Sequence, residues 1–336
     1  MAFNPLLKHP LVLENGVYYL IVPPILYTSL LTTFHFDIWA DEAYRSTYDE
    51  ARGRWLEERA LDVFRRLFAG RAEVHGRLKY GPRKARRELD GLVKFDNKAI
   101  LIEGKWKTLT LPAKRGDVKA IIRDLEGSIR DSYRQATQAR EYVRSMEVAV
   151  FEDSTGRKVM VRNDETQEVF MVSLVGRNDL AVFAANPSLL YELGLFGPAD
   201  FPWVVSLMDL KVVVEFLEFP SQFFDYLKRR DAILQTGKFN FHDEWDLLGA
   251  YLHSVLDPAD KRYEGADFVW LSGMDEEVER YLAARDNPNM QVELPARKIS
   301  DSIRNLIHAI EDLTGSAAAR NAGANAETAI QEDNTR

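Results

Sequence analysis

A short apolar hairpin constrains this chain more than any other feature. Residues 88–106 read ELDGLVKFDNKAILIEGKW, with two apolar runs, Leu89–Phe95 and Ala99–Ile102, around the turn-forming Asp96-Asn97-Lys98. Two such runs separated by a short polar turn predict a β-hairpin. The middle of the chain is therefore expected to contain a sheet with two adjacent, largely buried strands.

Charged residues stand at one end of this hairpin. Asp90 lies near the start of the first strand, and Glu103 and Lys105 follow the apolar part of the second. Glu103 and Lys105 are two residues apart, so their side chains leave the same face of a strand. Two carboxylates supply the oxygen ligands that Mg²⁺ and Mn²⁺ prefer, and a nearby ammonium stabilises an anionic reaction centre or positions a water.

The composition bounds the class of protein. A chain of 336 residues is long enough for more than one domain, and the absence of cysteine excludes disulfides, iron–sulfur clusters and thiolate zinc sites. A cytoplasmic location is expected, and no signal peptide is recognised. The apolar segment 17–33 is short for a membrane span and contains Pro23-Pro24, so a buried strand, a turn and a helix are predicted there instead. No membrane association is expected.

The charge is unevenly distributed. Residues 51–147 contain 24 Lys and Arg against 14 Asp and Glu, a net charge of +10, although the whole chain has a formal charge of −8. The remaining residues hold 20 basic and 38 acidic side chains. A basic segment in an acidic chain is typical of a site for a polyanion such as nucleic acid, and a solvated face that binds nothing is the alternative.

The order of elements in the middle of the chain predicts an α/β domain. Apolar spacing predicts an amphipathic helix over Arg52–Phe68. It is followed by a strand over Ala72–Tyr80, the hairpin, and a long helix over Asp117–Met146 that Gly127 weakens. A second hairpin (Val148–Phe151 and Lys158–Val161) and a buried strand (Val169–Val175) complete the pattern.

Four regions are predicted on this basis. Residues 1–50 form an N-terminal extension that packs on the core, and residues 51–175 form the basic α/β domain. Residues 176–314 form a mostly helical, acidic accessory region. Residues 315–336 are rich in Ala, Asn and Gly without apolar periodicity, which predicts a disordered tail.

The hairpin and the elements around it resemble the PD-(D/E)xK nuclease superfamily, which has the restriction-endonuclease-like fold. The resemblance is carried by Asp90, by Glu103-Gly104-Lys105 and by the order helix, three strands, helix, strand. Gln138-Ala-Arg-Glu-Tyr142 on the long helix is similar to the QxxxY motif of RecB-like nucleases. The resemblance covers about the middle third of the chain, and it implies a mixed central sheet flanked by helices.

The same resemblance implies a metal-dependent nuclease that uses Mg²⁺ or Mn²⁺. It assigns Asp90, Glu103 and the Gly104 carbonyl to the metal, and it gives Lys105 the role of orienting water or stabilising the transition state. The family also has an acid on the first helix. Glu57 fits that position best and would complete a second metal site, directly or through water. Glu58 is the weaker candidate because it points toward Leu61 and Arg65. Gln138 and Tyr142 would contact the nucleic-acid backbone or support the metal ligands.

Basic residues around the hairpin are the candidate phosphate contacts: Arg83, Lys84, Arg86, Arg87, Lys107, Lys114 and Arg115. The favoured function is a DNase in repair, recombination or defence against foreign DNA, with a helicase, an ATPase or another protein as partner and an oligomer as an open option. A nucleic-acid-binding subunit that does not cut, and a scaffold acting through the acidic half, are the alternatives.

Overall fold

The chain forms two compact units in the computed structural model, which describes residues 6, 9–107, 109–176, 180, 183, 187–196, 202–285, 287 and 289–311. One unit comprises Met1–Trp55 and Leu109–Asp124, and the other comprises Leu56–Thr108 and Leu125–Arg336. The predicted tail, residues 315–336, lies outside the described residues. None of the helices described is both long enough and apolar enough to cross a membrane.

The first unit contains a small hairpin and a helix. Strands β1 (Leu11–Glu14) and β2 (Val17–Leu20) pair antiparallel around Asn15-Gly16, and α1 (Pro23–Ala40) begins at the two prolines. Pro favours the first turn of a helix because its missing N–H has no partner there. The strand and helix agree with the prediction, but β2 is exposed rather than buried, since Val17, Tyr18 and Tyr19 are each at least half exposed. Packing of residues 1–50 on the core stays a prediction.

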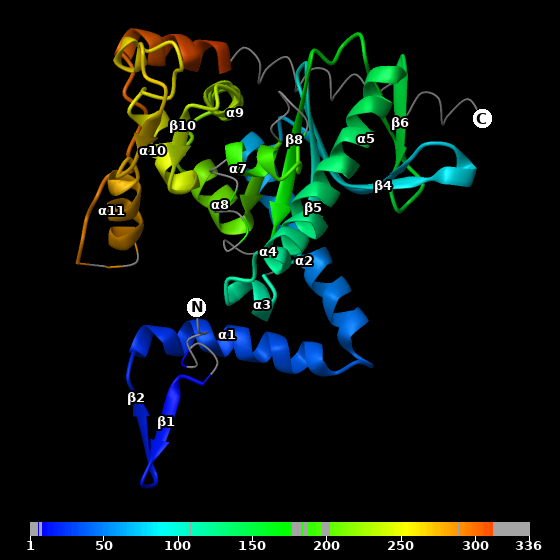
Figure 1. Cartoon of the computed structure of the whole chain (residues 1–336). Coiled ribbons are helices and arrows are strands. Elements are labelled where there is room, and N and C mark those ends of the chain that lie inside the picture. Colours follow the sequence, from blue (N-terminus) through cyan, green and yellow to red (C-terminus); the bar gives the residue numbers. More distant parts are fainter. Residues whose placement is uncertain are drawn as a thin grey trace. The chain divides into compact units, whose positions relative to one another are not determined.

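A mixed seven-stranded sheet forms the centre of the second unit, with the strand order β7-β6-β3-β4-β5-β8-β9. The three strands β5, β8 and β9 are parallel, and the other neighbouring pairs are antiparallel. Helices flank this sheet (Figure 1), which confirms the α/β class. The strands are β3 (Glu73–Tyr80), β4 (Arg87–Phe95), β5 (Lys98–Lys105), β6 (Val148–Glu152), β7 (Lys158–Arg162), β8 (Glu168–Val175) and β9 (Trp203–Ser206).

The predicted hairpin is β4 and β5. Phe95 pairs with Lys98, so the turn consists of Asp96 and Asn97 alone, and Asp96 adopts a φ of +51°. Asp tolerates this left-handed conformation better than most residues. Both strands are longer than their apolar runs, and β5 continues through Lys105. The acids at the end of the hairpin therefore belong to the sheet itself.

The two faces of the sheet are covered by different helices. Helix α2 (Arg45–Phe68) contributes its buried residues from Leu56 onward to one core, and α5 (Asp131–Ser145) contributes to the other. Gly76 and Gly91 pair across β3 and β4, and a Cβ at either position would lie within 3.0 Å of the Leu61 side chain. Glycine suits both positions because α2 packs close to the sheet, and a Cβ at either position would force the Leu61 side chain to shift.

The long helix predicted over residues 117–146 consists of three joined segments. Helix α4 (Val118–Leu125) is followed by a π-helical stretch, Glu126–Arg130, and then by α5. The π-helical stretch contains Gly127, the residue that weakened the prediction. A short helix, α3 (Leu111–Lys114), precedes α4. Such π-helical insertions are common near functional sites.

The acidic C-terminal half is mostly helical, and it shares the core of α2. The segment from Trp203 to Leu217 lies in the region predicted to be mostly helical, but it is strand β9 followed by helix α8, so this region adds a strand to the central sheet. The compact unit thus extends across residue 176, where the sequence places a boundary. Residues 301–311 are also helical. The other elements are α7 (Pro187–Glu192), α8 (Leu207–Glu215), α9 (Pro220–Gln235), β10 (Phe239–Phe241), α10 (Glu244–Leu252), β11 (Val269–Leu271) and α11 (Glu276–Arg285).

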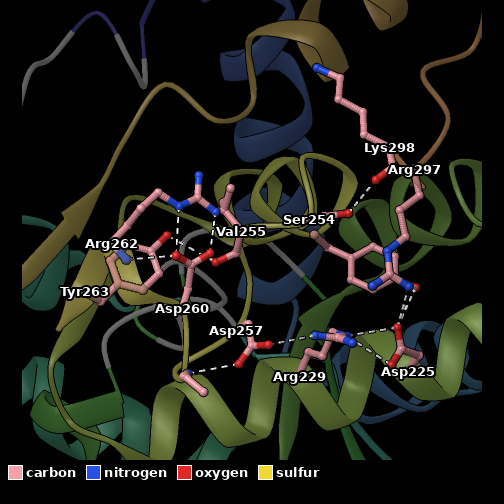
Figure 2. Close-up of polar contacts among 12 residues, drawn as sticks. Asp225, Arg229, Ser254, Val255, Asp257, Asp260, Arg262, Tyr263, Arg297 and Lys298 are labelled. Carbon is pink, nitrogen blue, oxygen red and sulfur yellow. Dashed lines mark hydrogen bonds and ion pairs between the residues drawn. The ribbon is translucent and has the colours of Figure 1, made fainter. Parts of the chain in front are cut away.

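A polar network holds the segment before the last helical stretch against α9 (Figure 2). Arg297 donates to Asp225 at 2.6 Å and to the Tyr251 hydroxyl at 3.0 Å, and its guanidinium lies over the Tyr251 ring. Ser254 donates to the Lys298 carbonyl at 2.8 Å. These contacts attach an irregular segment that has few apolar side chains of its own.

A buried ion pair inside this half gives the first prediction. Arg230 donates to both oxygens of Glu244, which also accepts from the Trp203 indole at 2.7 Å. Arg230→Met is expected to lower the free energy of unfolding by about 3–5 kcal/mol, because it leaves a buried carboxylate without its cation. Urea denaturation measures the change. Arg229→Met is the matched control, with an expected loss of about 1 kcal/mol or less because Arg229 pairs at the surface. Equal losses would contradict the prediction.

Candidate functional site

Asp90, near the start of β4, and Glu103, near the end of β5, lie side by side. Gly91 pairs with Ile102, so the next position outward in the same register brings Asp90 opposite Glu103. The Gly104 amide donates to Asp90 Oδ2 at 2.8 Å, and the two carboxyl groups share a hydrogen bond. Glu103 is only 1% exposed, and its Oε1 has no hydrogen-bond partner among the described groups. A buried carboxylate oxygen without a partner is costly, and a bound cation would supply the missing interaction.

Glu57 reaches the same place from helix α2. A Cβ built on Gly104 would lie 3.8 Å from both Glu57 Cγ and Asp90 Oδ2, so these two side chains flank the Gly104 backbone. Glu58, the weaker candidate on this helix, is exposed to solvent. The structure thus brings Glu57, Asp90 and Glu103 together from two strands and a helix.

Burial raises the pKa of all three acids, and the charge of Asp90 adds to this effect at Glu57 and Glu103. Burial, with a contribution from Asp90, raises the pKa of Glu103 to about 9. Burial and Asp90 raise the pKa of Glu57 to about 7, and burial also raises the pKa of Asp90. The hydrogen bond between Asp90 and Glu103 raises the pKa of Glu103 and lowers that of Asp90, as expected when Glu103 donates and Asp90 accepts. Several carboxyl groups crowded in a buried place are typical of a site that binds a cation.

Lys105 lies close enough to influence all three acids. Burial raises the pKa of Glu57, Asp90 and Glu103. The positive charge of Lys105 acts in the opposite direction and lowers the pKa of each of them. The side chain is half-buried on β5, two residues beyond Glu103. The structure therefore places one carboxyl group and one ammonium group of the triplet Glu103-Gly104-Lys105 beside Asp90.

The oxygen donors fit a divalent cation such as Mg²⁺. Asp90 and Glu103 are adjacent, and the orphan Oε1 of Glu103 is available as a ligand. Glu57 lies farther from this pair. Asp90 and Glu103 share a hydrogen bond, but among the described residues the three acids do not have ligand atoms that all lie within 4.8 Å of one another. This spacing favours a contribution from Glu57 through water over direct ligation.

A second cluster of side chains that could bind a metal ion lies elsewhere in this unit. His242, Asp243 and Asp246 have ligand atoms within 4.8 Å of one another. Asp243 caps α10 by accepting from two backbone amides, and both oxygens of Asp246 accept from the amides of His242 and Met274. These hydrogen bonds explain the cluster as a helix cap. We therefore favour Asp90 and Glu103 over this cluster as the candidate metal site.

The strands change face at the level of the acids. Residues four apart on a strand normally share a face. Val74 and Leu78 of β3, however, belong to opposite cores, and so do Leu89 and Val93 of β4. Between the members of the first pair lies Arg77, a non-glycine residue with a φ of +54°. Its Nε lies 3.7 Å from Glu57 Oε2. Nothing in the local sequence marks Arg77 for this position.

Ser173 is a second residue that sequence reasoning missed. It pairs with Glu103 in the parallel register of β5 and β8, so the two side chains leave the same face of the sheet. Ser173 is fully buried, and its hydroxyl has no hydrogen-bond partner among the described groups. A serine in an otherwise apolar buried strand, EVFMVSLV, is the signal that would have identified it.

Tyr142 and Gln138 lie on α5. The Tyr142 hydroxyl donates to the Val150 carbonyl at 3.1 Å, and its ring packs on Tyr80 with centroids 5.1 Å apart. Burial, together with the charge of Glu103, raises the pKa of Tyr80 to about 12. Tyr142 thus supports the neighbourhood of Glu103 by way of Tyr80. Gln138 is half-buried one turn earlier on α5.

The predicted phosphate contacts are distributed over both units. Arg83, Lys84, Arg86 and Arg87 follow one another in and beside a short 3₁₀ helix between β3 and β4, and all four are exposed. Arg86 pairs with Glu152 through two hydrogen bonds, and Lys107 donates to the Gly127 carbonyl. Lys114 and Arg115 belong to the other unit and are not located relative to this site.

Comparisons with known proteins add no identification, because no family model, curated protein or solved structure matches the chain. The assignment of function therefore depends on the residues and the geometry of the site.

Proposed function

We propose that this protein is a metal-dependent nuclease with a restriction-endonuclease-like fold, acting on DNA. The observation that carries the proposal is the buried Asp90–Glu103 pair, with an orphan Glu103 oxygen and with Glu57 and Lys105 beside it. The order of α2, β3, β4, β5, α5 and β8, with β5 and β8 parallel, supports the fold. The basic surface of residues 83–87 supports a polyanionic substrate.

Phosphodiester hydrolysis requires a water that attacks phosphorus and a leaving sugar oxygen whose bond to phosphorus breaks. Asp90, Glu103 and the Gly104 carbonyl would hold Mg²⁺ or Mn²⁺, which neutralises charge on the phosphoryl oxygens when bound. Lys105 stabilises the negative charge that develops and helps to orient the attacking water. Glu57 holds water at the edge of the site, and Tyr142 supports the sheet behind Glu103. The biological setting that fits this activity is repair, recombination or defence against foreign DNA.

Cleavage assays on linear, circular and single-stranded DNA, each with Mg²⁺, Mn²⁺ or EDTA, test the proposal. Asp90→Asn is expected to lower the Mg²⁺-dependent rate at least about 10³-fold, because it removes a charged ligand at the centre of the site. Asp96→Asn is the matched control: it makes the same chemical change at the exposed turn of the same hairpin, where Asn tolerates the positive φ. Cleavage that persists in Asp90→Asn or in EDTA would contradict the proposal.

A binding subunit without catalysis is the second candidate. The exposed basic residues favour this candidate, because they could contact phosphates. The buried acids do not favour it, because binding a phosphate requires no buried carboxylate oxygen without a partner. Salt-dependent DNA binding without cleavage would select it. Absence of any salt-dependent affinity would instead favour a scaffold acting through the acidic half.

A further inference from the structure

A strained arginine lies beside the proposed metal ligands. Arg77 is in the middle of β3, opposite Asp90. Gly76 pairs with Gly91 and Leu78 pairs with Leu89, but Arg77 and Asp90 between them do not pair in the β3–β4 register. Its φ of +54° lies in the left-handed region, which is unfavourable for a residue with a Cβ and a long side chain. Residues on either side pair normally, so the deformation is local.

The deformation has a structural consequence. Because β3 changes face at Arg77, Val74 packs with α2 and Leu78 packs with α5. The side chain of Arg77 consequently lies next to Glu57 on α2. A glycine or asparagine would adopt this backbone at lower cost. The chain therefore holds an arginine where its backbone is disfavoured, and strained residues of this kind concentrate at functional sites.

The ion pair with Glu57 does not account for this strain. Its Nε–Oε2 distance of 3.7 Å exceeds that of a normal hydrogen bond, and the Arg77 side chain is half exposed. Exposed pairs of this kind contribute little to stability. No other ion pair of Arg77 is found among the described residues. Its terminal guanidinium nitrogens remain available to an anion.

We propose that Arg77 is a second cationic residue of this site, which binds a non-bridging oxygen of the scissile phosphate on the side opposite Lys105. The inference rests on the proposed nuclease function and extends it to a residue that no sequence motif marks. A guanidinium presents paired N–H donors that match phosphate geometry. Lys105 projects from β5 and Arg77 from β3, with Asp90 of β4 between these strands, so the two cations approach the acids from different sides.

The test uses substitutions that tolerate the backbone and remove the cation. Arg77→Gly and Arg77→Asn are expected to lower the single-turnover cleavage rate in Mg²⁺ about 100-fold or more. Their melting temperatures without metal should equal or exceed that of the wild type, because both residues accept a positive φ. Arg77→Lys should recover part of the rate. Lys79→Ala, which removes an exposed cation two residues away on the same strand, is the control and should leave the rate within about threefold.

The outcomes separate this inference from the function on which it rests. A wild-type protein that cleaves, with Arg77→Gly and Arg77→Asn cleaving equally fast, would remove the role of Arg77 and leave the nuclease intact. A lower melting temperature together with a lower rate in both variants would make Arg77 a structural residue, which also overturns the inference. A wild-type protein without metal-dependent cleavage would remove the proposed function, and the role of Arg77 with it.

Discussion

Glu103→Gln is expected to abolish metal-dependent cleavage and, without metal, to stabilise the protein at pH 8. Burial and the neighbouring Asp90 raise the pKa of Glu103 to about 9, so the folded protein holds a proton there that the unfolded chain releases. Glutamine imitates the neutral acid, keeps a donor for Asp90 and needs no proton. The gain in the free energy of unfolding should be on the order of 1–3 kcal/mol at pH 8.

The sign of the pH dependence follows from the raised pKa. Between the ordinary value of 4.5 and about 9, the folded state binds more protons at Glu103 than the unfolded state. The contribution of this residue to stability is therefore full below pH 4.5 and is lost as the pH rises toward 9. Thermal melts of the wild type and Glu103→Gln should differ little at pH 4.5 and increasingly up to pH 9.

Two comparisons make this prediction specific. Glu58→Gln, at the exposed acid next to Glu57, should show no such pH-dependent difference from the wild type. Addition of Mg²⁺ should raise the melting temperature of the wild type and not that of Glu103→Gln, since a ligand stabilises only the state that binds it. A Glu103→Gln variant less stable than the wild type at pH 8 would mean that this carboxyl is not held neutral.

Lys105→Met is expected to separate catalysis from metal binding. The cleavage rate should fall about 10²–10³-fold, because the ammonium that stabilises the developing negative charge is lost. Mn²⁺ affinity, measured by calorimetry, should stay the same or rise. The reason is electrostatic: the positive charge of Lys105 acts on Asp90 and Glu103 and repels a metal cation that approaches them, and this repulsion is lost in the variant.

The control for this variant is Lys79→Met, which removes an exposed ammonium of β3 and should retain both properties. Asp90→Asn provides the opposite pattern, with cleavage and Mn²⁺ binding lost together. If Lys105→Met also lost Mn²⁺ binding, the lysine would be needed to hold the acids in place and not for the chemistry itself.

The central hairpin and its acids were predictable because their information is local. Apolar runs on both sides of a polar turn identify β4 and β5, and the spacing of Glu103 and Lys105 places them on one face. The apolar period of α2 similarly placed Glu57, and not Glu58, on the face of buried residues. Each of these inferences needed only neighbouring residues in one element.

Residues far apart in the sequence were not predictable in this way. Ser173 is in the site because β8 pairs with β5 in a register that no local pattern reveals. Strand β9 was missed because the segment from Trp203 to Leu217 is mostly apolar, and a short buried strand followed by a helix is hard to distinguish by composition from one buried helix.

The sequence by itself determined which chemistry the middle of the chain offers: two acids and a lysine on a hairpin, an acid on the preceding helix and a basic loop beside them. Tertiary structure decided how these groups meet. Burial between two helical layers gives the acids their raised pKa values, and the left-handed backbone of Arg77 directs a further cation to Glu57. The physical reason is that desolvation and strand register depend on contacts between distant segments, which only the folded chain brings together.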